Sequence, residues 1–90
     1  MVDTPMVPSH SFAEAALTGY LKDNAVSELV IVEHEPGAYR LEALLTWRTG
    51  RSVLVAARGG TRLWRSLDTL RRFFAAIGVG KTSVRMELLE

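Results

Sequence analysis

A cluster of arginines beside a tryptophan is the constellation in this sequence best suited to binding. Arg58, Arg62 and Arg65 lie around Gly59-Gly60 and Trp64, directly before a helical pattern. Arginine together with an aromatic side chain is the composition that holds phosphates and stacks on nucleic-acid bases. The same residues also fit a structural role, in which the arginines solvate a loop or pair with acids and Trp64 closes the core. We predict Arg58, Arg62, Trp64 and Arg65 as the contact residues of any binding site.

The remaining polar groups match no arrangement for catalysis or metal binding. His34 alternates with Glu33 and Glu35 across a strand end, so the three side chains do not converge on an ion. Gly80-Lys81-Thr82 has the last residues of a phosphate-binding loop, but the first glycine is missing and the segment runs from helix to strand. Ser66 and Ser83 have no base in a recognisable arrangement. We therefore expect no enzyme activity, no metal site and no cofactor.

Charge is divided unevenly along the chain. Residues 1–45 carry two basic residues against seven acids, and residues 46–90 carry nine against three, which gives the halves charges of −5 and +6. This division indicates either a basic face for an anionic partner or two complementary faces that meet within or between protomers. The positions of Glu33, Glu35 and Glu42 separate these cases, because acids beside the arginines would cancel their field.

Length and composition indicate a small cytoplasmic domain. The 90 residues contain no cysteine, which excludes disulfides, a thiol nucleophile and cysteine-based zinc sites. No apolar run approaches the roughly 20 residues of a membrane span, and the first residues lack the pattern of a signal peptide. A domain of this size buries only about 60% of its unfolded surface, so its stability is marginal or shared with a partner, and a homodimer is one option.

Two helices are predicted. One lies at about residues 67 to 77, because Ser66 is a good N-cap and Gly78 is a typical stop. The other lies earlier in the chain, from Phe12 to about residue 23, because Ser11 and Glu14 have the spacing of a capping box. Residues 1–10 precede it as a flexible tail, and residues 11–90 form a single domain. The later helix carries a stripe spanning roughly 120° that should face a core: Leu67, Leu70, Phe73, Phe74 and Ile77.

Four strands are predicted from β-branched runs and alternation. The first is the run 29–32, which ends before the tight-turn dipeptide Pro36-Gly37. The second spans 39–47, a third follows the turn at Thr49-Gly50, and a fourth alternates over 82–89. The residues expected on the buried face of the second and third strands are Tyr39, Leu41, Ala43, Leu45, Trp47, Val53, Val55 and Ala57.

The predicted order of elements is therefore α-β-β-β-α-β. A sheet with one apolar face and helices with one apolar stripe imply two layers, with both helices on the same face of the sheet. We expect an α+β fold in which a mostly antiparallel four-stranded sheet carries two helices on one face and leaves the other face partly open.

One resemblance rests on about a third of the chain. The segment from Ala57 through Arg58-Gly59-Gly60-Thr61-Arg62-Leu63-Trp64-Arg65 to Leu70, followed by Ile77-Gly78-Val79 and an alternating last strand, resembles small accessory proteins of plasmids and integrative elements, including ParC-type partition-associated proteins. The resemblance implies a role in plasmid maintenance or transfer. It brings no catalytic residues and no cofactor.

Two functional hypotheses follow from these patterns. In the first, the chain is a non-enzymatic accessory protein that binds a protein partner or itself through the open sheet face or an exposed strand edge. In the second, it is a nucleic-acid-binding module that uses the basic second half. Neither hypothesis involves a membrane.

Overall fold

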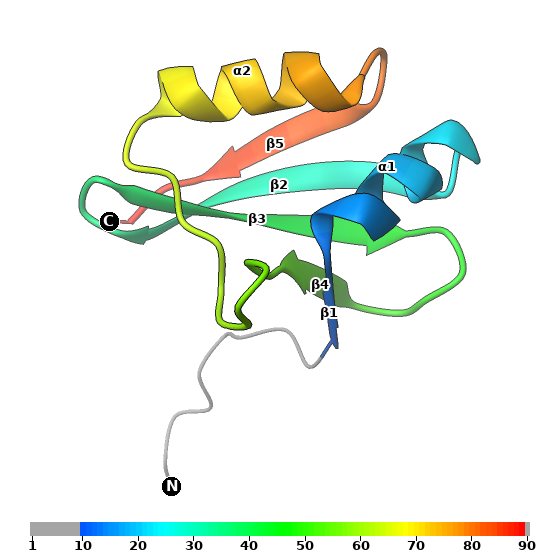
Figure 1. Ribbon diagram of the computed structural model, residues 1–90, viewed down its shortest axis with the longest axis horizontal. Coiled ribbons are helices and arrows are strands. Elements are labelled where there is room, and N and C mark those ends of the chain that lie inside the picture. Colours follow the sequence, from blue (N-terminus) through cyan, green and yellow to red (C-terminus); the bar gives the residue numbers. More distant parts are fainter. Residues whose placement is uncertain (1–9, 90) are drawn as a thin grey trace, which may run out of the picture.

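The computed structural model describes residues 10–89 and has the element order β-α-β-β-β-α-β. The α+β class is confirmed, but the sheet has five strands instead of four and is mixed instead of mostly antiparallel (Figure 1). The elements are β1 (His10–Phe12), α1 (Glu14–Lys22), β2 (Val26–Glu35), β3 (Ala38–Leu45), β4 (Arg51–Leu54), α2 (Leu67–Ile77) and β5 (Ser83–Glu87).

The strands lie side by side in the order β1-β4-β3-β2-β5. The three central strands form the predicted antiparallel meander. The two outer strands pair in parallel, β1 with β4 and β5 with β2. The first and the last strand of the chain are therefore the two edges of the sheet.

The turn between β2 and β3 is the predicted Pro36-Gly37 turn. Gly37 has a φ of 78°, in the left-handed region that glycine enters without a steric cost. β2 is longer than the predicted run 29–32, because its whole length pairs with β3, from Val26 opposite Leu45 to Glu35 opposite Ala38.

Helix α2 begins and ends where the sequence predicts. The Ser66 hydroxyl accepts a hydrogen bond from the Thr69 amide at 3.2 Å, and Gly78 closes the helix with a φ of 78°. Leu70 is fully buried, but Leu67 is 39% exposed, so the apolar stripe is not buried along its whole length. The prediction that Leu67 is a core residue is wrong, because it occupies the first turn.

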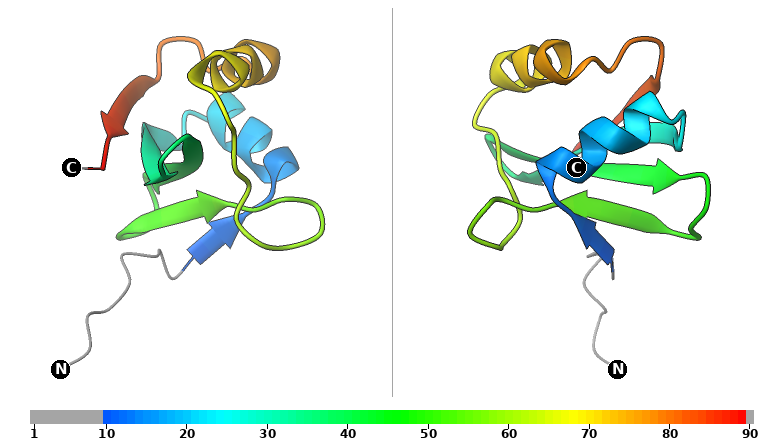
Figure 2. Two further views of the ribbon diagram at one scale, coloured as in Figure 1. Left: turned by 90° about the vertical axis from the view of Figure 1, so that its left-hand side faces the viewer. Right: turned by 45° about the vertical axis from the view of Figure 1, so that its right-hand side comes forward.

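Both helices cover one face of the sheet, as predicted, which gives two layers (Figure 2). Leu41, Ala43 and Leu45 of β3 point into the core between the layers, and Tyr39 packs against it. Phe12, Leu17 and Leu70 bring the first strand and both helices into the same cluster. The core therefore joins the start of the described chain to the central strands and to both helices.

The start of the domain differs from the prediction. Residues 1–9 of the predicted tail lie outside the described residues, and His10 is already the first residue of β1. Ser11 pairs with Val53 in the parallel ladder, so it is unable to serve as the N-cap of the predicted capping box. Ala13 occupies the N-cap position without a side-chain hydrogen bond, and α1 starts at Glu14. A three-residue strand is too short to give a pattern of its own.

The predicted phase of β4 is off by one residue. Ser52 pairs with Ala43 and Val53 pairs with Glu42, so Ser52 lies on the helix-covered face and Val53 on the opposite one. Leu54, not Val53 or Val55, joins the core cluster. The run Val53-Leu54-Val55 is apolar in both phases, and the pairing with β3 selects one of them.

No helix among residues 10–89 has both the length and the apolar character that crossing a membrane requires.

Candidate interaction surface

The structure separates the four predicted contact residues. Trp64 is only 6% exposed and belongs to the core cluster. Its amide donates to the carbonyl of Tyr39 at 2.9 Å and its carbonyl accepts from the Tyr39 amide at 2.8 Å, which fixes the connection to the sheet. Its ring lies 5.0 Å from that of Phe73. Trp64 therefore closes the core, and it has no free face on which a base could stack.

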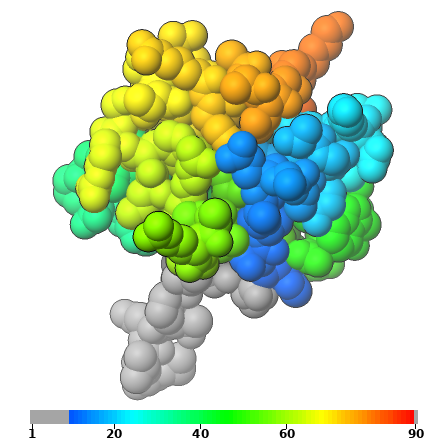
Figure 3. Space-filling view, in the orientation of Figure 1, coloured from blue at the N-terminus to red at the C-terminus, as the bar shows by residue number. Residues whose placement is uncertain are grey.

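Arg62 lies beside Trp64, as its sequence position suggests, but its charge is already paired. Its guanidinium lies 4.8 Å from the Trp64 ring centre and 5.1 Å from that of Phe73. It also forms a 2.7 Å ion pair with Glu14 at the start of α1. Figure 3 shows the segment between β4 and α2, to which Arg62 belongs, packed against both helices. Arg62 thus ties that segment to α1.

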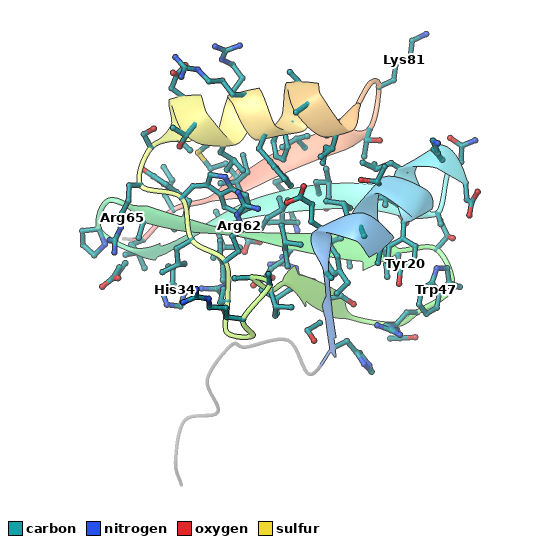
Figure 4. All side chains as sticks on the ribbon, viewed as in Figure 1. Tyr20, His34, Trp47, Arg62, Arg65 and Lys81 are labelled. Atoms are coloured by element: carbon teal, nitrogen blue, oxygen red, sulfur yellow. The ribbon has the colours of Figure 1, made fainter. Side chains whose placement is uncertain are left out.

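Arg58 and Arg65 are exposed, and neither forms an ion pair with another residue in the range 10–89. Arg65 lies at one end of the sheet, while Arg62 lies nearer its centre (Figure 4). Arg58 belongs to the turn that follows β4. The predicted cluster is therefore two free arginines that flank a packed segment, and not one basic surface with an aromatic side chain on it.

Two other groups of polar residues were weighed as candidate sites in the sequence. Among the described residues, no three His, Asp or Glu side chains come close enough together to hold a metal ion. Gly80-Lys81-Thr82 lies in the turn between α2 and β5, where the Thr82 amide donates to the Val79 carbonyl at 3.2 Å. Lys81 points away from the body of the molecule (Figure 4).

A different aromatic side chain is exposed. Trp47, which the alternation placed on the buried face of a long second strand, lies beyond the end of β3 and is 52% exposed. Arg48 covers one side of it at 4.4 Å from a ring centre, and Tyr20 contacts its ring edge-on at 5.7 Å. The sequence analysis did not identify Trp47 and Arg48 as an exposed pair. Their adjacency in the sequence was the signal that could have indicated it.

The sheet face opposite the helices carries an ion-pair network. Glu42 is 1% exposed and accepts from Arg40 at 2.7 Å and from Arg51 at 3.1 Å. Arg51 also forms two hydrogen bonds with Glu87 of β5, at 2.8 and 2.6 Å. Arg85 lies more loosely, 3.4 Å from Glu28 and 3.5 Å from Glu87. Acids of the first half thus neutralise arginines of the second half within one chain.

The network changes the acidity of two of its members. Hydrogen bonds from Arg51 hold the pKa of the Glu87 carboxyl below its ordinary value of 4.5, although partial desolvation acts in the other direction. The reciprocal hydrogen bonds from Glu87, with a smaller contribution from Glu42, raise the pKa of Arg51. Both groups are therefore ionised at neutral pH.

Apolar side chains remain exposed along β5. Val84 and Met86 pair with Leu29 and Ile31 of β2, so they lie on the helix-covered face. They are nevertheless 42% and 41% exposed, and Leu88, which continues the alternation, is 59% exposed. We call these three residues, Val84, Met86 and Leu88, the β5 patch. The sequence predicts their common face, but the partial exposure follows from the edge position of β5.

The outer edge of β5 is open in the described part of the chain. β5 pairs only with β2, and the view on the left of Figure 2 shows no other described element beyond it. A sheet edge presents unpaired backbone amides and carbonyls that can pair with another strand. The opposite edge, β1, has three residues, compared with five in β5.

Comparisons with protein-family models, curated proteins and solved structures found no match to this chain.

Proposed function

We propose that this chain is a non-enzymatic accessory protein that binds a polypeptide strand, from a partner protein or from a second copy, at the outer edge of β5. The role in a plasmid or mobile element and the cytoplasmic location rest on the sequence resemblance and composition described above. The interaction is one of strand addition, in which main-chain hydrogen bonds provide affinity and side chains beside the edge provide selectivity.

The observation that carries this proposal is the β5 patch at an open sheet edge. Soluble proteins usually protect such an edge with a charge pointing inward, a proline, a bulge or a covering segment. β5 has none of these on its helix-covered face, where Val84 and Met86 are 42% and 41% exposed. An apolar side chain on each side of Arg85 supports binding of a strand that offers apolar groups at the same spacing.

The alternative, nucleic-acid binding, has less support from the geometry. Trp64 is buried and Arg62 is paired with Glu14, so two of the four predicted contact residues are engaged inside the fold. Arg71 and Arg72 both contact Asp68, at 3.1 and 3.0 Å. Binding of a protein partner accounts for the exposed apolar side chains of the β5 patch, whereas binding of nucleic-acid phosphates does not require them.

The test compares the mass of the parent chain with that of Met86→Lys as concentration increases, by sedimentation velocity. An inward-facing lysine is a natural guard of sheet edges, so this variant should remain monomeric where the parent associates. Leu67→Lys, which places the same charge at an exposed site of similar accessibility on α2, is the control and should behave as the parent.

The competing function is measured in the same samples. Duplex DNA, single-stranded DNA and RNA are added at two salt concentrations to the parent and to Arg58→Glu/Arg65→Glu. A monomeric parent that binds nucleic acid with a salt slope that the double variant flattens by about two units would replace our proposal by the alternative.

A further inference from the structure

The side chains of β5 favour one particular ligand strand. Building on the proposed function, we propose that the strand that binds β5 is β5 of a second copy, running antiparallel, with Met86 opposite Met86 on a two-fold axis. Directly opposite residues of an antiparallel pair point to the same face of the sheet. In β5, Val84 and Met86 point to the helix-covered face, while Arg85 and Glu87 point to the other.

Charge selects among the symmetric registers. A two-fold axis at Arg85 would place two arginines opposite each other, and an axis at Glu87 would do the same with two glutamates, which is unfavourable. An axis at Val84 would place Arg85 opposite Ser83 and Met86 opposite Thr82, so it would join no arginine with a glutamate and would pair an apolar side chain with a polar one. The axis at Met86 places Arg85 of each copy opposite Glu87 of the other, so both symmetric pairs join opposite charges.

The same register also matches the apolar side chains. Val84 of each copy lies opposite Leu88 of the other, and Met86 lies opposite itself. These are the three residues of the β5 patch: Val84 is 42% exposed, Met86 is 41% exposed and Leu88 is 59% exposed. Every member of the patch therefore meets another member, and no charged side chain faces the apolar side of the contact.

The ion-pair network continues through this contact. Within one chain, Arg51 holds Glu87 tightly at 2.6 Å, whereas Arg85 is 48% exposed and lies 3.4 Å from Glu28 and 3.5 Å from Glu87. Arg85 thus has hydrogen-bonding capacity left for a second carboxylate. In the pair, a chain of ion pairs would run from Glu28 through Arg85 of one copy to Glu87 and Arg51 of the other.

A cysteine scan measures the register directly, because the chain contains no cysteine. Opposite β-carbons lie about 4.5 to 5.5 Å apart, close to the distance that a disulfide needs. Met86→Cys should therefore form a disulfide-linked dimer on mild oxidation. In Val84→Cys alone or Leu88→Cys alone, the two cysteines would be offset by four residues, about 13 Å, and should not join. A mixture of these two variants should form the linked heterodimer.

Each pattern of cross-links has a definite meaning. Linkage of Met86→Cys, and of the mixture but not its components, supports the register. Linkage of Val84→Cys alone, or a parent dimer in which none of these variants links, overturns the register while the strand-binding function stands. A parent that stays monomeric at all concentrations overturns the homodimer, and if no added polypeptide binds β5, the proposed function fails as well.

Charge exchange provides a second readout that does not depend on oxidation. Arg85→Glu should place two glutamates opposite each other at both symmetric positions, and Glu87→Arg should do the same with arginines, so each variant should dimerise about tenfold more weakly than the parent. Mixed together, they restore opposite charges at both positions and should form a heterodimer with recovered affinity. Arg71→Glu, on the exposed surface of α2, is the matched control and should leave dimerisation unchanged. Failure of the mixture to recover, with both variants folded by circular dichroism, overturns the register.

Discussion

At the scale of single residues, the arginines of this chain differ in what their guanidinium groups contact. Arg62 is held between two aromatic rings and Glu14, and Arg51 joins Glu42 to Glu87. Arg58 and Arg65 lie free on the surface described. Their spacing in the sequence does not reveal this difference, because Glu14 and Arg62 are 48 residues apart. The contacts within the fold, and not the local composition, decide which arginines remain for a partner.

Two leucines of α2 provide the first prediction. Leu70 is fully buried, so Leu70→Ala should lower the free energy of unfolding by roughly 2 to 5 kcal/mol. Leu67 is 39% exposed, so Leu67→Ala should cost about 1 kcal/mol or less. Urea unfolding of both variants checks the difference. Equal midpoints would mean that the first turn of α2 is as well packed as its middle.

The ion pair between Arg51 and Glu87 provides the second prediction. Because the pKa of Glu87 is lowered in the folded state, the pair stabilises the fold above the ordinary value of 4.5 and loses that effect as pH falls through the lowered value. Glu87→Gln should therefore be less stable than the parent at pH 7 and should converge with it in acid. Unfolding midpoints are measured from neutral to acidic pH at a concentration where both chains are monomeric. A constant difference across the range would exclude this source of pH dependence.

At the scale of elements, local signals and distant pairings contribute differently. The limits of α2 follow from Ser66 and Gly78, whose effects act within one helical turn. β1 exists because β4 pairs with it, and Ser11 lies in that ladder although its spacing to Glu14 predicts a cap. The phase of β4 is likewise set by its pairing with β3. Sequence patterns therefore predicted the fold class, the antiparallel meander and α2. They did not predict the edge strand β1 or which residues of β4 face the helices.

Two glycines provide a prediction at this scale. Gly19 lies inside α1 with a negative φ, and a β-carbon there would meet no atom within 4 Å, so Gly19→Ala should stabilise the fold by about 0.5 to 1 kcal/mol. Gly78 has a φ of 78°, so Gly78→Ala should destabilise it by about 1 to 2 kcal/mol. Thermal unfolding of the pair checks the sign of each effect. Stabilisation by both substitutions would contradict the left-handed end of α2.

The candidate site was predictable only in part. Alternation over residues 82–89 placed Val84, Met86 and Leu88 on one face, and the sequence left a strand edge open as a docking site. It did not reveal that β5 is at the edge of the sheet, because this depends on parallel pairing with β2, more than fifty residues earlier. Within the predicted Arg and Trp cluster, Arg62 lies over the Trp64 ring, but the burial of Trp64 gives this pair a role in the core.

At the scale of the whole molecule, the fold accounts for two features of the sequence: the division of charge between the halves and the small size of the core. Arg51 and Arg85 of the basic half meet Glu42 and Glu28 of the acidic half on one sheet face, so part of the charge division is neutralised inside a single chain. The apolar surface that the small domain leaves uncovered is concentrated at β5. A second copy paired there would extend the sheet across the two-fold axis and bury the β5 patch.

The most direct test of this account is amide hydrogen exchange of the parent chain, followed by mass spectrometry at low and high protein concentration. Pairing at the β5 edge gives hydrogen-bond partners to amides that face solvent in the monomer. We predict that exchange in residues 83–89 slows as concentration rises, that Met86→Lys abolishes this slowing, and that exchange in residues 10–12 at the opposite edge stays unchanged. Slowing at residues 10–12 with residues 83–89 unaffected, in a sample shown to be dimeric, would contradict the account.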